Sequence, residues 1–123
     1  MTITKTNYIQ PDFAKQDGLV PVIVQEYNQN QGGRVLMLAY ANDEAYNLTL
    51  ETGFAHFWSR SRKKLWKKGE TSGNPLKVKE IWIDCDQDTL LYLVTSRGAV
   101  CHLGGSNCFF RVTDCDSEEP KKK

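Results

Sequence analysis

The sequence predicts an α+β fold that is mostly β, a single domain of about seven strands with one short helix. Short runs of β-branched and aromatic residues recur along the chain, and turn residues such as glycine, asparagine and serine separate them. One segment, Asp43–Thr52, carries helix signals, since Asn42 can cap its first turn and Gly53 can end it. With 123 residues, 40% of them hydrophobic, the chain can bury one core without disulfides to hold it together.

The strand candidates share alternating or continuous apolar patterns. They are Leu19–Tyr27, Val35–Tyr40, Phe54–Arg62, Leu76–Ile83, Thr89–Thr95, Ala99–Leu103 and Cys108–Val112. Pro21 suggests that the first is an edge strand, because proline cannot donate a ladder hydrogen bond. The second is continuously apolar and is expected to be buried on both faces. Lys63–Asn74, which is basic and contains glycines, is expected to be a long loop.

The chain divides into an N-terminal arm (1–18), a folded domain (19–112) and a polar tail (113–123). Its net charge of +1 implies no bulk attraction to nucleic acid or to anionic membranes. No apolar run approaches about 18 residues, and the N-terminus lacks the pattern of a signal peptide, which favours a cytoplasmic protein. In that compartment the four cysteines stay reduced, which favours metal ligation or simple burial over disulfides.

The cysteines Cys85, Cys101, Cys108 and Cys115 form no C-x-x-C pair, which argues against a structural zinc module. The first three suit an open zinc site of three thiolates and a water, the arrangement of a catalytic metal. Unclustered buried thiols are the alternative. Cys115 lies between two aspartates whose charges disfavour a thiolate, so we expect it to be a spare thiol.

A base near such a site would help to activate the water, because three thiolates leave the zinc unit with a negative charge. His102 directly follows Cys101 and is therefore the candidate catalytic residue. Adjacent strand residues point to opposite faces, so His102 reaches the metal only if the backbone bends at the following glycine turn. A structural histidine is the alternative, and His56 is a weaker candidate.

Three carboxylates flank the first cysteine at every second position, in Asp84, Asp86 and Asp88. In an extended run they would share one face, roughly 7 Å apart. An EF-hand is excluded, because the glycine and the bidentate glutamate of that loop are missing. Magnesium held by these carboxylates and by substrate oxygens is the better interpretation, and an acidic turn without a metal is the alternative.

A basic stretch with interleaved tryptophans is the third feature, and six of the nine residues from Arg60 to Lys68 are Lys or Arg. Aromatic rings among cations suit single-stranded nucleic acid, or a smaller phosphorylated ligand. The following residues add hydroxyls and a carboxylate. The candidate substrate contacts are Trp58, Arg60, Arg62, Glu70, Thr71 and Ser72.

Four motifs in this order resemble the phosphoribosyl-AMP cyclohydrolase family of histidine biosynthesis. They are WSRSR (58–62), KGETSGN (68–74), DCDQD (84–88) and the CH…C set (101–102 and 108), and the resemblance covers about residues 18–112. It implies a hydrolase that opens the adenine ring of phosphoribosyl-AMP at the N1–C6 bond with a zinc-activated water. It also implies an intertwined homodimer with zinc sites at the interface.

By position, the resemblance makes Cys85, Cys101 and Cys108 the zinc ligands. It makes the three aspartates of 84–88 the magnesium ligands. Two positions depart from the usual pattern of the family, in which a threonine follows the Cys-His pair and a serine precedes the last zinc cysteine. This chain has Leu103 and Asn107 there.

Two functions of other classes remain as alternatives. The first is a nucleic-acid-binding module with a structural zinc site, which would use Trp58, Trp66 and the basic stretch; the near-neutral charge argues against it. The second is a metal-buffering protein, which leaves the WSRSR stretch unexplained. The expected partners are therefore a small phosphorylated nucleotide and a second copy of the chain, with neither nucleic acid nor membrane.

Overall fold

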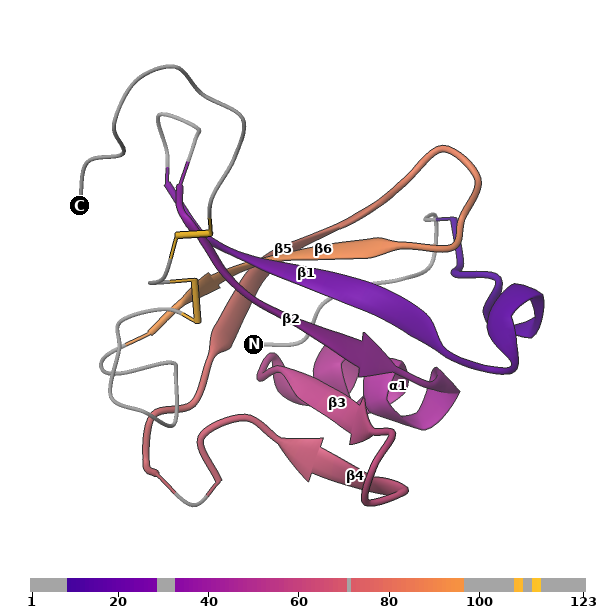
Figure 1. Ribbon diagram of the computed structural model, residues 1–123, viewed down its shortest axis with the longest axis horizontal. Helices are drawn as coiled ribbons and strands as arrows, with labels where there is room; N and C mark the ends of the chain where they lie inside the picture. Colours follow the sequence, from indigo (N-terminus) through magenta and orange to yellow (C-terminus); the bar gives the residue numbers. More distant parts are fainter. Residues whose placement is uncertain (1–8, 29–32, 71, 97–107, 110–111, 114–123) are drawn as a thin grey trace.

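A computed structural model describes residues 9–28, 33–70, 72–96, 108–109 and 112–113 (Figure 1). Six strands, one α-helix and one 3-10 turn form in these ranges, which confirms the mostly-β α+β class. The strands are β1 (Val20–Glu26), β2 (Val35–Ala41), β3 (His56–Ser59), β4 (Lys64–Lys67), β5 (Lys77–Ile83) and β6 (Leu90–Thr95). The helix is α1 (Asp43–Thr52) and the 3-10 turn is η1 (Phe13–Gln16).

Four strands form one twisted sheet in the order β2-β1-β6-β5. The central pair, β1 and β6, is parallel and runs in register from Val22 opposite Leu90 to Glu26 opposite Val94, whereas the outer pairs are antiparallel. The chain therefore enters β1 and β6 at the same end of the sheet. The turn between β5 and β6 lies at that end, next to η1 (Figure 1).

One face of the sheet carries the core. Val20, Val22 and Val24 of β1 alternate along the strand and are fully buried. The helix and the two-stranded β3–β4 hairpin lie on this side of the sheet (Figure 1). Phe57 of β3 packs the hairpin against the sheet, because its ring centroid lies 6.1 Å from that of Tyr92 in β6. Within the hairpin, it lies 5.2 Å from the ring centroid of Trp66 in β4.

The opposite face carries a line of apolar side chains that we call the apolar row. Leu38, Ile23, Leu91 and Trp82 are direct cross-strand neighbours, one from each strand in sheet order. Leu38 is 49% exposed and Trp82 is 58% exposed. A large apolar row with this much exposure is typical of a surface that meets another protein chain.

Two expectations about burial are wrong. Pro21 does not mark an edge strand, because β1 lies inside the sheet; pairing with β6 begins only at Val22, so no β6 residue needs the missing Pro21 N–H. The apolar strand over Val35–Tyr40 is not buried on both faces. It is β2 at the sheet edge, and its Leu38 belongs to the exposed apolar row.

The strand expected over Phe54–Arg62 is longer than the strand observed, β3. The segment Lys63–Asn74, expected to be a loop, contains the strand β4. The first strand ends at Ser59, residues 60–63 form a turn, and β4 pairs back onto β3. Lys63 takes a left-handed conformation with φ of 54°, which reverses the chain. The charged residues of β4 conceal its pattern, because only Leu65 and Trp66 are apolar there.

The two strands expected near the C-terminus are described only in part. Ala99–Leu103 lies outside the described residues. Of Cys108–Val112, the described residues Cys108, Phe109 and Val112 are not in a strand. The remaining strands and the helix agree with expectation to within a residue or two at each end, except for β3 and β4. In the described part of the chain no helix has the length and apolar character to cross a membrane.

Local signals account for the helix. Asn42 Oδ1 accepts a hydrogen bond from the Ala45 N–H at 2.9 Å, and Gly53, with φ of 80°, donates its N–H to the Thr49 carbonyl at 2.9 Å. These are the two ends that the sequence predicts. Helix α1 also holds β3 in place through Thr49, which is fully buried. The Thr49 hydroxyl donates to the Ala45 carbonyl at 2.9 Å and accepts the His56 N–H at 2.9 Å.

Replacing Thr49 by valine should lower the free energy of unfolding by about 1–3 kcal/mol, because the buried His56 N–H loses its acceptor. Urea denaturation measures the change. Thr52→Val is the matched control: Thr52 also donates to a carbonyl one turn back, that of Leu48 at 2.8 Å, but it is exposed. The control should stay within about 0.5 kcal/mol of the wild type. Equal losses in the two variants would contradict the role of the Thr49 hydroxyl.

Candidate active site

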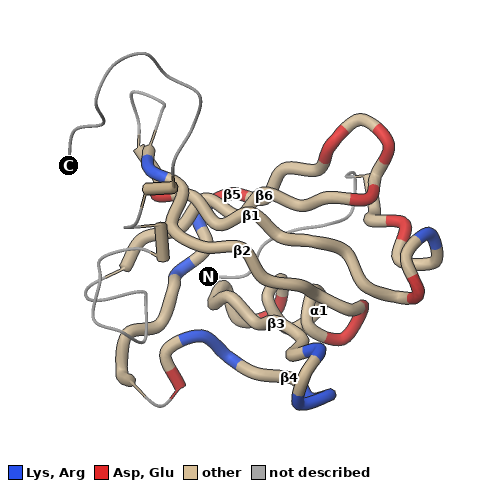
Figure 2. The backbone as a smooth tube through the Cα atoms, in the orientation of Figure 1, with Lys and Arg blue, Asp and Glu red and all other residues tan. Residues whose placement is uncertain are grey.

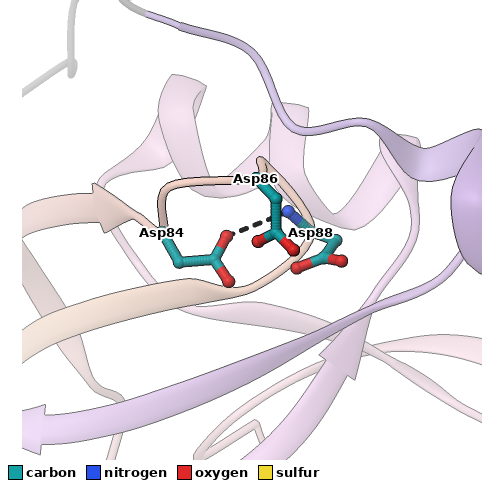
Figure 3. A group of neighbouring side chains, drawn as sticks. All are labelled: Asp84, Asp86 and Asp88. Atoms are coloured by element: carbon teal, nitrogen blue, oxygen red, sulfur yellow. Dashed lines mark hydrogen bonds between the residues drawn. The ribbon is translucent and has the colours of Figure 1, made fainter.

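The turn between β5 and β6 is built around the carboxylate of Asp84. Its Oδ1 accepts the backbone N–H of Asp88 at 3.0 Å (Figure 3). The same oxygen accepts the N–H of Thr89 at 3.1 Å. The Asp84 N–H donates to the Thr89 carbonyl at 3.1 Å, and Gln87 takes a left-handed φ of 66°. A tight turn therefore replaces the extended run that the alternating sequence suggested.

This turn gathers three carboxylates. One oxygen each of Asp84, Asp86 and Asp88 lies within 4.8 Å of the other two (Figure 3). The ligands of an octahedral magnesium ion lie about 3–4 Å apart, given bonds of about 2.1 Å. Small side-chain rotations bring the oxygens to that spacing, so the donor set fits a hard divalent cation.

The cluster holds its charge unevenly. For Asp84, desolvation raises the pKa, but the N–H groups of Asp88 and Thr89 outweigh it and hold the pKa below its usual value. For Asp88, desolvation and then the neighbouring Asp86 and Asp84 raise the pKa. The ionised Asp84 carboxylate thus stabilises the turn, whereas the Asp88 carboxylate is repelled by the like charges of its neighbours.

Two of the predicted zinc ligands are described, and they lie far apart in one chain. Cys85 is exposed in the β5–β6 turn. Cys108, also exposed, donates its N–H to the Leu36 carbonyl of β2 at 2.7 Å. In Figure 1 the β5–β6 turn and the described segment 108–109, drawn in yellow, lie toward opposite ends of the sheet.

The register of the sheet sets a lower limit on their separation. Leu90 of β6 and Ala39 of β2 both pair with Val22 of β1, so they lie at the same height in the sheet. Leu36 lies three residues from Ala39, toward the other end of the sheet. The backbones of the two cysteines are therefore at least roughly 10 Å apart along the strands, and two strand spacings add about 10 Å across the sheet, more than two cysteine side chains can span. Sulfurs that share a zinc ion lie about 4 Å apart. Cys85 and Cys108 of one chain therefore cannot bind the same metal ion. The predicted ligand Cys101 and the predicted base His102 lie outside the described residues.

The basic candidates lie on the β3–β4 hairpin, where Lys and Arg gather in the turn (Figure 2). Trp58 is half-buried on β3. Arg60 and Arg62 are exposed in the turn, although the strand expected over Phe54–Arg62 included both. The Arg60 guanidinium lies 3.8 Å from the centroid of the Tyr40 ring, an aromatic partner that sequence analysis missed because Tyr40 closes an apolar strand.

The loop after β4 is closed on itself. Gly73 donates its N–H to the Gly69 carbonyl at 2.9 Å, and the Ser72 hydroxyl accepts the Asn74 N–H at 3.3 Å. Gly69 has φ of 85°, and a Cβ there would lie 2.3 Å from the Asn74 carbonyl carbon, so only glycine suits this position. Glu70 is exposed on this loop, and Thr71 lies outside the described residues.

His56 has a structural role here. Its Nδ1 lies 2.8 Å from the Phe54 carbonyl oxygen, which can only accept, so Nδ1 carries the proton. The residue is buried at the start of β3.

Comparison with known proteins gives consistent matches. The family profile described as phosphoribosyl-AMP cyclohydrolase matches residues 37–110. The phosphoribosyl-AMP cyclohydrolase of Archaeoglobus fulgidus is 60% identical over 82% of this chain and 91% of its own length. That of Listeria innocua is 57% identical over 82% of this chain and 91% of its own length. The histidine biosynthesis bifunctional protein of Aquifex aeolicus is 57% identical over 78% of this chain and 46% of its own length.

The opposite pKa shifts in the β5–β6 turn, which we call the acidic turn (residues 84–89), predict opposite changes in thermal stability for two alanine variants when no divalent cation is present. Asp84 has a lowered pKa in the fold, so its ionised form adds stability above its unfolded pKa, and this stability is lost as the pH falls. Asp88 has a raised pKa, so its ionisation removes stability as the pH rises through the folded pKa. At neutral pH Asp84→Ala should lower the melting temperature and Asp88→Ala should raise it.

Thermal unfolding in a chelating buffer measures both variants, and a repeat at pH 3 is the control. There Asp88→Ala should lose its advantage, because the Asp88 carboxyl is then protonated in both states. Destabilisation of equal size by both substitutions at neutral pH would contradict the unequal roles.

Proposed function

The chain belongs to the phosphoribosyl-AMP cyclohydrolase family, and we propose that it opens the adenine ring of phosphoribosyl-AMP at the N1–C6 bond, a hydrolytic step of histidine biosynthesis. The structural observation that most supports this proposal is the gathering of three carboxylates around Cys85 in the β5–β6 turn. A hard-cation site beside a thiol suits a reaction that binds a phosphorylated substrate and activates a water.

Magnesium is the cation we propose for the carboxylate cluster. Asp84, Asp86 and Asp88 would supply three of its oxygen ligands. Substrate phosphate and water oxygens would complete the coordination. The hydrogen bonds from Asp88 and Thr89 fix Asp84 in advance, so little reorganisation is needed when a cation binds.

The substrate phosphates would also meet the basic hairpin. Arg60 and Arg62 are exposed and can each bind a phosphate in a bidentate manner. Stacking on Tyr40 holds the Arg60 guanidinium in place, and no carboxylate among the described residues forms an ion pair with it, so its charge can attract an anion. Trp58, Glu70, Thr71 and Ser72 are the further contacts we propose for the ribose and the base.

Zinc is proposed to bind between two chains. Cys85 and Cys108 cannot share an ion within one chain, as the sheet register requires. A homodimer in which Cys85 of one protomer meets Cys101 and Cys108 of its partner removes this conflict. The apolar row on the free face of the sheet supports dimer formation, since its Leu38 and Trp82 side chains are about half exposed.

Bound zinc would lower the pKa of a water molecule and so supply the nucleophile for C6. His102, the neighbour of the ligand Cys101, is proposed to move a proton to N1 as the ring opens. The carboxylate cluster and the hairpin hold the phosphates, and thereby orient the purine toward the thiols. N1 carries the second ribosyl phosphate, which polarises the ring and makes C6 open to attack.

The purified protein, with zinc and magnesium present, should convert phosphoribosyl-AMP to the ring-opened aminoimidazole carboxamide product. It should leave AMP unchanged, because N1 of AMP is unsubstituted. The change in ultraviolet absorbance follows the reaction, and Cys85→Ser is the inactive control. Submicromolar binding of single-stranded RNA at about 0.15 M salt, combined with no hydrolysis, would favour the nucleic-acid-binding module instead.

A mixture of two inactive variants tests the shared zinc site. Cys85→Ser and Cys108→Ser should each be inactive alone. When they are refolded together, about half of the dimers are mixed and each mixed dimer keeps one of its two sites, so about one quarter of the wild-type activity should return. Zinc content should recover in parallel.

The matched control mixes Cys85→Ser with the double variant that lacks both thiols. No pairing of those chains restores a complete site, so this mixture should stay inactive. If Cys85 and Cys108 came from the same chain, the first mixture would be as inactive as the control, and the two-chain site would be wrong.

A further inference from the structure

The segment that precedes β1 lies against the acidic turn. The Asp12 N–H donates to the Gln87 carbonyl at 2.7 Å, and Gln87 Nε2 donates to the Gln10 carbonyl at 2.9 Å. These two bonds join parts of the chain more than seventy residues apart, 77 for the second. They fix the segment to the turn without any contribution from a charged side chain.

Lys15 of η1 reaches the carboxylate cluster from this segment. Its ammonium group donates to the Asp86 carbonyl oxygen and lies 4.0 Å from Asp88 Oδ2. The Lys15 side chain is 41% exposed and that of Asp88 is 20% exposed, so the pair is at the surface but not fully in solvent. In Figure 2 this lysine-bearing turn and the aspartates of the β5–β6 turn lie at the same end of the molecule.

We propose that Lys15 is the resident counter-ion of the carboxylate cluster and that a divalent cation must displace it to bind. The inference rests on the metal site proposed above but not on the proposed reaction. A cation held by Asp88 would lie within a few ångströms of the ammonium group, and two positive charges at that distance repel. Both cannot occupy the carboxylates at once.

The displacement needs no rearrangement of the backbone. The lysine side chain has four methylene groups and considerable exposure, so the ammonium group can swing into solvent. The bonds of Asp12 and Gln87 keep the segment in place when it does. Lys15 therefore lowers the affinity of the cluster for metal by its charge alone, and it neutralises part of the crowded carboxylates when no metal is bound.

Metal binding to charge-altered variants tests this directly. Free Mn²⁺ is measured by electron paramagnetic resonance in titrations of the zinc-loaded protein, and Mg²⁺ is then used to displace it. Lys15→Met should bind about 3- to 10-fold more tightly than the wild type, the effect of one exposed charge at about 4 Å. Lys15→Arg, which keeps the charge, should match the wild type.

Lys77→Met is the matched control for net charge. Lys77 is exposed on β5 of the same sheet, and its loss also changes the net charge by −1. It should leave the affinity unchanged, and the gain in Lys15→Met should shrink at about 0.5 M salt because of screening. Unchanged or weaker binding in Lys15→Met would overturn the proposal, since a merely structural lysine would not strengthen metal binding when removed.

A second measurement uses the wild-type chain and so does not depend on how a variant folds. Acetylation of each lysine is followed by mass spectrometry with and without Mg²⁺. Lys15 should become several-fold more reactive when Mg²⁺ is present, and Lys77 should not change. Constant Lys15 reactivity alongside measurable Mg²⁺ binding would overturn the counter-ion role and leave the metal site intact. Absence of any Mn²⁺ or Mg²⁺ binding by the wild type would overturn the metal site, and the counter-ion role with it.

Discussion

The parallel pairing of β1 with β6 governs where the β5–β6 turn, the 9–17 segment and Cys108 lie. Five residue pairs join these strands at the centre of the sheet, although β6 begins 64 positions after the end of β1 in the chain. Because the two strands run in the same direction, the segments before them share one end of the sheet and the segments after them leave at the other end. The acidic turn and the 9–17 segment precede the two strands, so they meet; Cys108 follows β6 and lies at the far end.

This arrangement explains why a single chain can assemble one of the two proposed metal sites but not the other. The carboxylate cluster is complete within the chain, because a single turn supplies all three aspartates. The thiols are not, because β6 separates Cys85 from Cys108 in sequence and carries the chain away from the turn. The second chain proposed above would unite thiols from opposite ends of the sheet, and the apolar row would be its contact surface.

Much of the fold could be predicted because its signals are local. Asn42 and Gly53 define both ends of α1 by hydrogen bonds within a few residues. The β3–β4 hairpin was partly missed, because Lys and Arg at its surface hide a strand that depends on Phe57 packing against Trp66. The order and direction of the strands could not be predicted, since nothing near β1 indicates that β6 will be its neighbour.

The same distinction applies to the site. The aspartates and the thiol among them could be identified from their spacing, but not the tight turn that brings the carboxylates together. Lys15 lies in the arm expected over residues 1–18, and its contact with the Asp86 carbonyl spans 71 positions. Contacts of that length depend on the completed sheet, and no pattern in the neighbouring residues indicates them.

The β3–β4 hairpin is separate from the main sheet, and this separation affects which part of the protein unfolds first. Strands β3 and β4 have four residues each and, within the described part of the chain, form a two-stranded sheet of their own, so few ladder hydrogen bonds protect them. Their anchors are the Phe57 ring and the buried Thr49 hydroxyl. Local opening therefore begins at the element that carries Arg60 and Arg62, while the four-stranded sheet persists. In mild denaturant, amide protons of the hairpin would exchange with solvent first, while those of the four-stranded sheet stay protected.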